Sequence, residues 1–595
     1  MNKVVSLSAL RDHVGRGQTV ALGGAWMSNH PMAAVRQLVR AQIGDLHIVD
    51  NLASIDVDLL IGAGLVRALT FSMVSLESFG LAPHFRRAAE EGTIAITEMS
   101  GVALNLAIDA AARSLPYLPM RDLGASQIPA YHPDRYAAIT CPFTDESLLA
   151  VRAIKPDVAV IHALRADPDG NAQLEGPMAI DPVLARAAAT VIVTCEEITS
   201  HEVIAQCPAS TIVPGFLVDA VIEAPLGAHP TTHVPSYGLD AWSIAEYVQV
   251  CRSGDDAWTD YIGRLAAESE DEYRARVAPP PRRRVLESLA RRGEILIAEP
   301  DRADDDTDPD PPWRIEELMV CRVADEVDDS GVTVLGSFTP LAYAAYMLAK
   351  LTHASDAWIA GFNALGVPAV ELNITSVESE LYRDAIAHWS FVDTTCTVHL
   401  GGRGLVECVS PAQIDGDGSI NTSVIGTDYW HPVIRLPGGA GAPEVVQHYT
   451  KIVAYVGRHD RRTLVEKVDF RTGGRSPIGA AARRSRGLPA GPIRVVTPLA
   501  VMTKDHDDRP FALESAHPGV DIDEIVANTG FKLSIPAEIQ RTREPTSHQL
   551  ALIRDQIDPF GTIRFDFMNA SARSNYINEI LEREWKRAET ALMHA

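Results

Sequence analysis

The strongest constraint on the fold of this chain is an internal duplication. Residues 19–40 and 331–350 both read as an apolar strand, a glycine-containing turn and a helix whose apolar positions recur every three or four residues. Pro31 and Pro340 fall at the matching place, in the first turn of each expected helix, where proline is tolerated. Self-similarity over so long a period predicts two copies of one domain on a single chain.

The similarity continues downstream of these helices. Residues 156–176 and 407–426 each give an apolar strand, an Asp-x-Asp-Gly sequence typical of a β-turn, and then an Asn. Residues 190–198 and 450–459 are both strand-like. Short apolar strands that alternate with helices predict the α/β class, with two homologous open sheets, parallel or mixed, and helices on both faces. We expect the active site at the interface of the two domains, where glycine-rich turns would line it.

A segment of different composition separates the two copies. Residues 278–312 begin with APPPRRR, and their last part, 301–312, holds six Asp and three Pro. A stretch of this kind cannot bury a core and is typical of an exposed linker. We therefore predict a first domain over 1–277, a linker over 278–312 and a second domain over 313–595.

Composition and charge exclude several classes of function. The net charge of −25 argues against nucleic acid and anionic membrane as partners, and no apolar run approaches the ~18 residues of a membrane span. The seven cysteines form no CxxC pair, which argues against a disulfide framework and a zinc ribbon. The N-terminus lacks the pattern of a signal peptide, so we expect a cytoplasmic protein. No histidine stands at metal-binding spacing with Cys, Asp or Glu, and we expect no metal site.

Glycine-rich turns are the first candidates for ligand binding. They follow apolar segments at three places, at 23–24, 401–404 and 438–441. Glycine lets backbone N–H groups approach a phosphate or an oxyanion closely, although each turn taken alone is also explained by turn geometry. Glu98 is a further candidate, because it ends an apolar strand in an α/β pattern. It precedes a helix that Ser100 could cap, so a solvated or capping carboxylate is the alternative.

Taken in order, the motifs resemble the α and β subunits of the family I CoA-transferases, of the glutaconate CoA-transferase type. The first half carries VALGGAWMSNHP, SLESFG (75–80), ITEMS and CPFTDE, and the second half carries TVLGSFTPLA, QIDGDGSINTSVIG and PGGAGAP. The resemblance implies two fused subunits, a coenzyme A thioester as substrate, no permanently bound cofactor and a homodimer. Contacts to substrate or CoA are predicted for Gly23, Gly24, Ser75, Gly402, Gly438, Gly439 and Gly441.

One residue of the family pattern is missing. The family's transferases use a β-subunit Glu that attacks the acyl-CoA and becomes a glutamyl-CoA thioester. The matching strand here, residues 356–367, has Phe362 or Asn363 at that place. The amide of Asn363 cannot form the thioester, but it can donate a hydrogen bond to a carbonyl.

A branch of the family has also lost this Glu, namely the CoA-thioester hydrolases that open the last rings of steroid-derived β-diketones. The first half is similar to that branch at ITEMS and LPYLPMR. This resemblance makes Glu98 the predicted general base for a water molecule, with Asn363 as the second catalytic residue. We therefore expect a hydrolase that cleaves a C–C bond or a thioester. The alternatives are a true CoA-transferase with a substituted or displaced acid, and a non-catalytic acyl-CoA binding protein.

Overall fold

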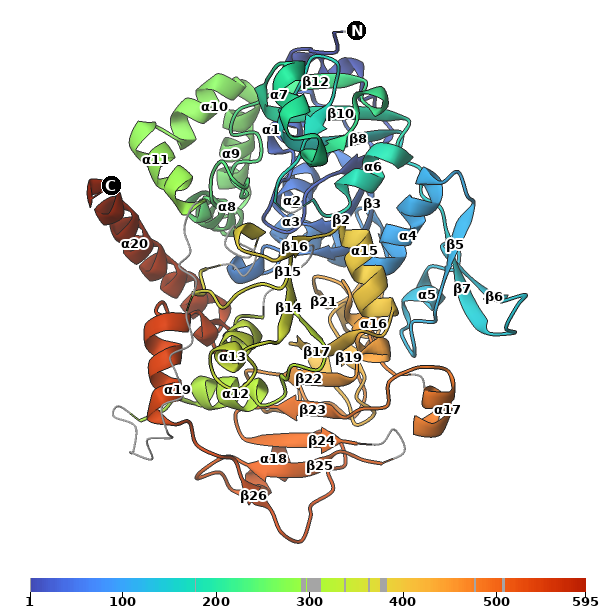
Figure 1. The fold of residues 1–595 in the computed structure, drawn as a ribbon, viewed down its shortest axis with the longest axis vertical. Coiled ribbons are helices and arrows are strands. Elements are labelled where there is room, and N and C mark those ends of the chain that lie inside the picture. The colour runs from blue at the N-terminus through green and yellow to red at the C-terminus, as the bar shows by residue number, and fades with distance from the viewer. Residues whose placement is uncertain are drawn as a thin grey trace.

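The fold is described from a computed structural model, which covers residues 2–594 except 177, 291–295, 297–311, 337–338, 362–363, 375–381, 476–477 and 506–508. The chain forms two α/β halves, with the first half above the second in Figure 1. No helix in this part of the chain has the length and apolar character needed to cross a membrane.

The first half is built on a nine-stranded sheet whose parallel part has the order β12-β10-β8-β1-β2-β3-β4. These strands are β1 (Thr19–Leu22), β2 (Leu46–Ala53), β3 (Val66–Val74), β4 (Ala95–Glu98), β8 (Val158–Ala166), β10 (Thr190–Ile198) and β12 (Ala220–Glu223). Two short strands, β9 (Ala172–Gln173) and β11 (Thr211–Val213), extend it in antiparallel pairing.

Helices cover both faces of this sheet, because alternate residues of its strands are apolar and buried on each side. Val20 and Leu22 belong to the core on the side of α1 (Met32–Ala41), α2 (Ile55–Gly62) and α3 (Pro83–Glu91). Ala21 belongs to the core on the side of α4 (Gly101–Ala112) and α6 (Asp181–Ala187).

The second half is built on a ten-stranded mixed sheet with the order β16-β15-β14-β13-β17-β22-β23-β24-β25-β26. Its parallel centre consists of β13 (Val332–Val334), β14 (Trp358–Gly361), β17 (Gly404–Val409), β22 (Lys451–Tyr455) and β23 (Ile493–Val496). The outer strands are β15 (Ala364–Leu365), β16 (Ala387–His388), β24 (Ala500–Lys504), β25 (Ala512–Ala516) and β26 (Gln540–Arg541).

The strand order confirms the predicted duplication. The order β2-β1-β8-β10-β12 in the first half matches β14-β13-β17-β22-β23 in the second, with the same parallel pairing throughout. Both predicted Asp-x-Asp-Gly turns also form, since Gly170 N donates to Asp167 O and Gly418 N to Asp415 O, each at 2.9 Å. The predicted fold class, two homologous α/β domains, is confirmed.

Smaller elements complete the two halves. In the first, β5 (Tyr117–Met120), β6 (Tyr136–Thr140) and β7 (Ser147–Arg152) form a separate three-stranded sheet, and the helices are α5 (Ile128–Tyr131), α7 (His201–Gln206), α8 (Ala241–Arg252), α9 (Asp255–Ala267) and α10 (Glu270–Val277). In the second, the helices are α12 (Ile315–Ala324), α13 (Pro340–Leu351), α15 (Phe391–Thr394), α16 (Ala442–His448), α17 (Gly479–Ser485), α18 (Ile522–Asn528) and α19 (Ser547–Ala551). Its short strand pairs are β18 (Gln413–Ile414) with β19 (Ile420–Asn421) and β20 (Val424–Ile425) with β21 (Ile434–Arg435).

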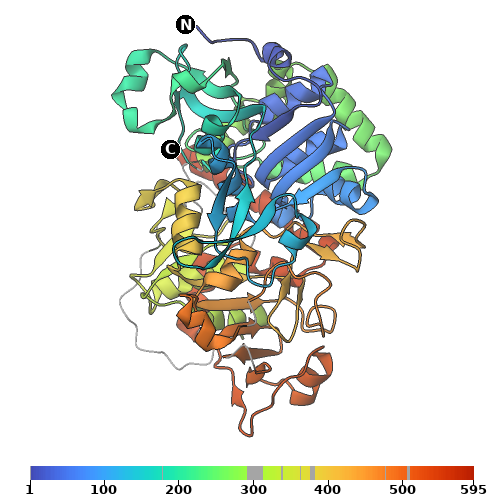
Figure 2. The ribbon, with the colours of Figure 1, turned by 90° about the vertical axis from the view of Figure 1, so that its right-hand side faces the viewer.

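The two halves contact each other at several places. The last helix, α20 (Ala570–His594), returns from the second half and packs on α8 and α11 (Pro280–Leu289) of the first (Figure 1). Figure 2 shows the separate three-stranded sheet of the first half in front of the rest of the chain. The segment that follows β5 contacts the second half, since Ala125 N donates to Gly474 O and Gln127 N to Arg471 O, each at 2.9 Å. Helix α11 begins the predicted linker, and its Leu286 is fully buried in the core of the first half. Most of the Asp-rich part of the linker lies outside the described residues.

Candidate active site

A small cavity of about 70 Å³ lies between the two halves. Its lining comes from Trp26, Leu52, Gly101 and Val102 of the first half and from Val334, Leu335, Gly336, Phe391, Thr394, Thr395, Val398, His399, Glu407, Ala440 and Gly441 of the second. Several of these residues end or follow central parallel strands, which is where α/β sheets bind ligands. With a water molecule occupying about 30 Å³ of liquid, the space suits the reacting end of a substrate.

Backbone contacts between the halves shape this cavity. Gly101 N, at the start of α4, donates to Ala440 O at 2.7 Å, and Ala440 N donates to Ser72 O at 3.0 Å. Trp26 and Ala440 both have left-handed backbones, with φ of 52° and 42°. Such conformations cost energy for non-glycine residues and concentrate at functional sites.

Two titratable side chains face the cavity from the second half. Glu407 lies on β17, and His399 lies in a π-helical segment, Thr395–Leu400. His399 Nδ1 is 2.9 Å from Tyr449 Oη and 3.9 Å from Glu407 Oε2. Two glycines lie close to these side chains. A Cβ atom on Gly336 would stand 3.6 Å from Glu407 Oε1, and a Cβ atom on Gly441 would stand 3.9 Å from His399 Nε2.

Burial determines the protonation states of Glu407 and His399. Loss of solvent raises the pKa of Glu407 to about 8, and the Tyr449 hydroxyl offsets this only in part. Burial also lowers the pKa of His399 to about 4. At neutral pH the cavity therefore holds a largely protonated carboxyl group beside a neutral imidazole, a pair that can give and take protons.

Glu98 lies at the interface of the halves and is fully buried. It ends β4, as predicted, and contacts three side chains of the second half. Its Oε1 accepts a hydrogen bond from Ser423 Oγ at 2.7 Å, and its Oε2 accepts from Tyr429 Oη at 2.9 Å and from Arg435 Nη2 at 2.6 Å. Burial opposes ionisation, but the charge of Arg435 and these hydrogen bonds hold the pKa of Glu98 below its ordinary value. Glu98 is therefore ionised at neutral pH.

Ser100 caps α4, as predicted, and its hydroxyl oxygen accepts a hydrogen bond from Ala103 N at 3.3 Å. The cap stabilises the start of α4, where the cavity residue Gly101 lies three positions after Glu98.

The predicted glycines occupy different surroundings. Gly24 N donates to the buried carboxylate of Asp181 at 2.9 Å, and a Cβ atom on Gly23 would stand 2.6 Å from the same oxygen, so this turn holds an internal side chain. Gly402 lies in an exposed turn with nothing within 4 Å of its Cβ position.

The loop 438–441 fits tightly against the first half. A Cβ atom on Gly438 would stand 2.5 Å from Ser72 O, and one on Gly439 would stand 3.2 Å from Ile128. Of the residues predicted from the sequence, Gly441 lines the cavity itself. Ser75 Oγ accepts a hydrogen bond from Glu77 N at 2.9 Å. Asn363 lies outside the described residues, so its predicted place beside this loop stays a prediction.

Sequence reasoning missed His399 and Glu407. A signal for Glu407 exists, since it is the one acid in the apolar strand GLVECV, residues 404–409. A charged residue within a strand buried on both faces points to a functional site. His399 gave no such signal, because only the fold brings its ring within 3.9 Å of the Glu407 carboxyl group.

Comparison with known proteins gives a consistent assignment. The model of the coenzyme A transferase family matches residues 7–224 and 327–528. The chain is 32% identical over 288 residues to the cholesterol ring-cleaving hydrolase IpdA subunit of Rhodococcus jostii, covering 46% of this chain and 96% of that protein. It is 34% identical over 273 residues to a glutaconate CoA-transferase subunit from Acidaminococcus fermentans, covering 43% of this chain and 85% of that protein.

Two further comparisons concern length and fold. A protein of Archaeoglobus fulgidus is 35% identical over 251 residues, and the match spans 42% of this chain and only 56% of that relative. The solved structure of the acyl-CoA transferase YdiF from Escherichia coli O157:H7 is similar in fold, with a TM-score of 0.64, 16% identity and coverage of 91% and 95%. The family model matches well over half of the chain, in two segments that lie one in each half. The chain therefore belongs to the coenzyme A transferase family.

Proposed function

We propose that this chain hydrolyses an acyl-CoA substrate, with water rather than an enzyme carboxylate as the nucleophile. The observation that carries the proposal is the carboxyl group of Glu407, which faces the interdomain cavity and is largely protonated at neutral pH. A protonated carboxyl group is a poor nucleophile but a good proton donor. Relatives that support this reading include the ring-cleaving hydrolase IpdA subunit.

Glu98 and Glu407 divide the acid and base roles, because their surroundings push the two pKa values in opposite directions. Glu98 does not itself line the cavity, but Gly101, three positions further along the chain, does. A carboxylate has about four acceptor positions, and Glu98 uses three, so the proposal places the water at the fourth position. Water adds to a substrate carbonyl carbon as Glu98 takes its proton. The C–S or C–C bond then breaks, and Glu407 protonates the leaving thiolate or carbanion.

The roles of Asn363 and of the glycine-rich loop are those predicted from the sequence. Asn363 donates a hydrogen bond to the substrate carbonyl, and the glycine-rich loop ending at Gly441 contacts the same end of the substrate. The cycle closes when Glu98 releases its proton to water and Glu407 takes one up from water. The neutral imidazole of His399, 3.9 Å from Glu407, relays this second proton by accepting it on one ring nitrogen as it gives one up from the other. We expect the fused chain to form a homodimer, which light scattering after size exclusion would test.

A direct test uses acetoacetyl-CoA and longer 3-oxoacyl-CoA thioesters in water enriched in oxygen-18. Hydrolysis puts the label into a product carboxylate. Release of free CoA thiol then identifies thioester cleavage, and a shortened chain still joined to CoA identifies C–C cleavage. Glu98→Gln should lower turnover about 100-fold or more. If no acyl-CoA is turned over, the proposal fails and the chain is a binding protein.

A true CoA-transferase is the second candidate, and Glu407 is the observation in its favour, since a carboxylate at the cavity is what that chemistry needs. Incubation with acyl-CoA and hydroxylamine separates the two. A transferase would carry a modified Glu, seen as a mass shift in the peptide that contains residue 407. A hydrolase would form product without any such shift.

A further inference from the structure

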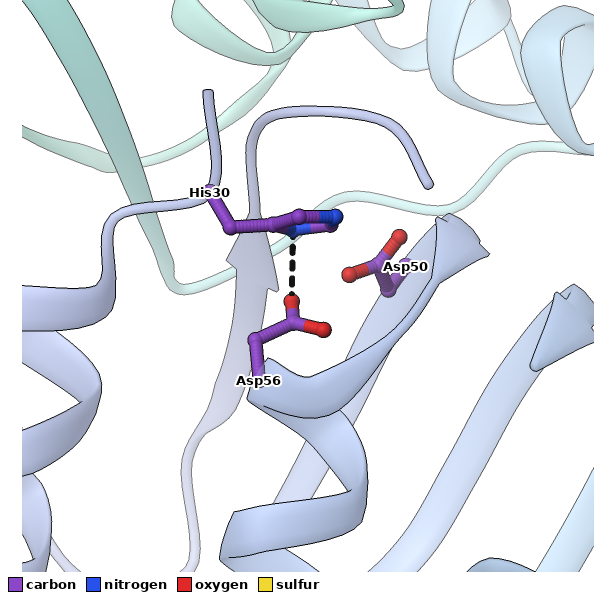
Figure 3. A group of neighbouring side chains, drawn as sticks. All are labelled: His30, Asp50 and Asp56. Carbon is purple, nitrogen blue, oxygen red and sulfur yellow. Dashed lines mark ion pairs between the residues drawn. The ribbon is translucent and has the colours of Figure 1, made fainter. Parts of the chain in front are cut away.

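A second group of titratable side chains lies inside the first half (Figure 3). His30 precedes α1, Asp50 lies on β2, and Asp56 lies in the first turn of α2. All three are fully buried, and one potential ligand atom of each lies within 4.8 Å of the others. Three separate segments thus bring one imidazole and two carboxylates together at the carboxyl end of the first sheet.

The orientation of His30 is that of a metal ligand. Its Nε2 lies 2.7 Å from the carbonyl oxygen of Trp26, which can only accept, so Nε2 carries a proton and donates it. Nδ1 faces the carboxylates and lies 2.8 Å from Asp56 Oδ2 (Figure 3). Metal-binding histidines characteristically donate their second N–H to a carbonyl or carboxylate in this way.

Asp50 supplies an independent observation. It is fully buried and aimed at the other two side chains, yet neither of its carboxylate oxygens has a hydrogen-bond partner among the described residues. Asp181 is close enough to act electrostatically on both His30 and Asp50. Its Oδ1 accepts from Gly24 N, and its Oδ2 is buried without a hydrogen-bond partner in the described part of the chain.

Burial and the neighbouring acids Asp56 and Asp181 raise the pKa of Asp50 well above its ordinary value, so without a bound cation Asp50 holds a proton. Buried carboxylates of this kind are costly unless they are paired or bind a metal ion.

We propose that His30, Asp50 and Asp56 bind a divalent transition-metal ion such as Mn²⁺ or Zn²⁺. One imidazole nitrogen with carboxylate oxygens suits these ions better than Mg²⁺ or Ca²⁺, which prefer oxygen alone.

The ion would have a structural role beyond the proposed activity. It would link β2, α2 and the loop before α1, and through His30 it would fix the carbonyl of Trp26, whose residue lines the cavity. Sequence spacing did not reveal a metal motif, because these ligands come from separate segments that only the fold brings together.

The test uses the full chain, stripped with a chelator and then dialysed against Mn²⁺ or Zn²⁺ in separate samples. Elemental analysis should give one ion per chain, and thermal unfolding should move upward by several degrees on loading. Asp50→Asn should lower the metal content at least tenfold. The matched control is Asp58→Asn, because Asp58 is another buried carboxylate of α2, but it accepts from Phe85 N and Tyr247 Oη, each at 2.7 Å. This control should retain the ion.

Comparing the metal-free and the loaded protein makes the test sharper. Burial and the neighbouring acids keep Asp50 protonated without metal, so Asp50→Asn should then melt close to the natural chain, and at a lower temperature than the natural chain when metal is present. Should Asp50→Asn fail to fold, His30→Gln replaces it in the metal analysis. The proposal is overturned if neither ion binds at one per chain, if binding survives substitution of Asp50 or His30, or if metal leaves the melting temperature unchanged. The cluster would then be a group of side chains that share a proton.

Discussion

The carboxylate of Glu98 and the guanidinium of Arg435 form an ion pair that joins the two halves, with Oε2 and Nη2 2.6 Å apart and both side chains fully buried. The pair sits among aromatic rings, because the guanidinium lies 5.3 Å from the ring centre of Phe71 and 5.5 Å from that of Tyr429. In such surroundings a charge without its partner cannot be rehydrated. The pair therefore couples the association of the halves to the ionisation of Glu98.

Arg435→Met tests this coupling. Removing one partner of a buried ion pair typically costs about 3–5 kcal/mol, whereas replacing both is much less costly. We expect a clear drop in melting temperature for Arg435→Met and a partial recovery when Glu98→Gln is added. Arg283→Met is the control, because the Arg283–Glu287 pair is exposed and should contribute less than about 1 kcal/mol. Equal losses for Arg435→Met and Arg283→Met would contradict a stabilising role for the buried pair.

Glu407→Gln tests the proton donor. The amide keeps the size and hydrogen bonding of the protonated acid but cannot release a proton, so substrate binding should persist while kcat falls about 100-fold or more. Glu444→Gln is a matched control, since burial also raises the pKa of Glu444 to about 8 and it is absent from the residues that line the cavity. A Glu407→Gln enzyme with full turnover would remove Glu407 from the mechanism.

The pH dependence follows from the same pKa shift. Activity that needs protonated Glu407 should fall as pH rises through about 8, and this decline should be absent from the residual activity of Glu407→Gln. Stability should follow the same direction. The folded pKa values of Glu407 and Glu444 lie above the ordinary 4.5, so their stabilisation is complete below pH 4.5 and is lost as pH rises through about 8. Melting temperatures measured from pH 5 to 9 should fall, and fall less in Glu444→Gln.

The sequence was sufficient to predict the fold, because repetition is a property of the chain itself. The two copies of strand, turn and helix at 19–40 and 331–350 became β1 with α1 and β13 with α13, each at the centre of its sheet. The ends of strands could also be predicted, from the apolar pattern, as the position of Glu98 at the end of β4 shows.

The site was harder to predict, since it depends on which residues meet across the interface. Nothing in the sequence near Glu98 indicates that Arg435 will neutralise it, 337 positions away. Likewise, the turn at Gly24 looked like a ligand cradle, but its amide is taken by Asp181 from the same half. A local pattern reports turn geometry and strand ends, whereas pairing and burial arise only when distant segments pack.

Gly438→Ala tests how closely the halves must approach. Gly438 has φ of 119°, and an added Cβ atom would stand 2.5 Å from the backbone oxygen of Ser72, which belongs to the opposite half. Because backbone atoms cannot yield as a flexible side chain can, the loop should be displaced, with a lower melting temperature and a loss of turnover. Gly519→Ala is the control for backbone strain alone, since its φ is 78° and its Cβ position has nothing within 4 Å. It should cost about 1 kcal/mol and leave turnover unchanged. If the two variants behaved alike in calorimetry and in turnover, the close contact between loop 438–441 and the first half would not matter for the site.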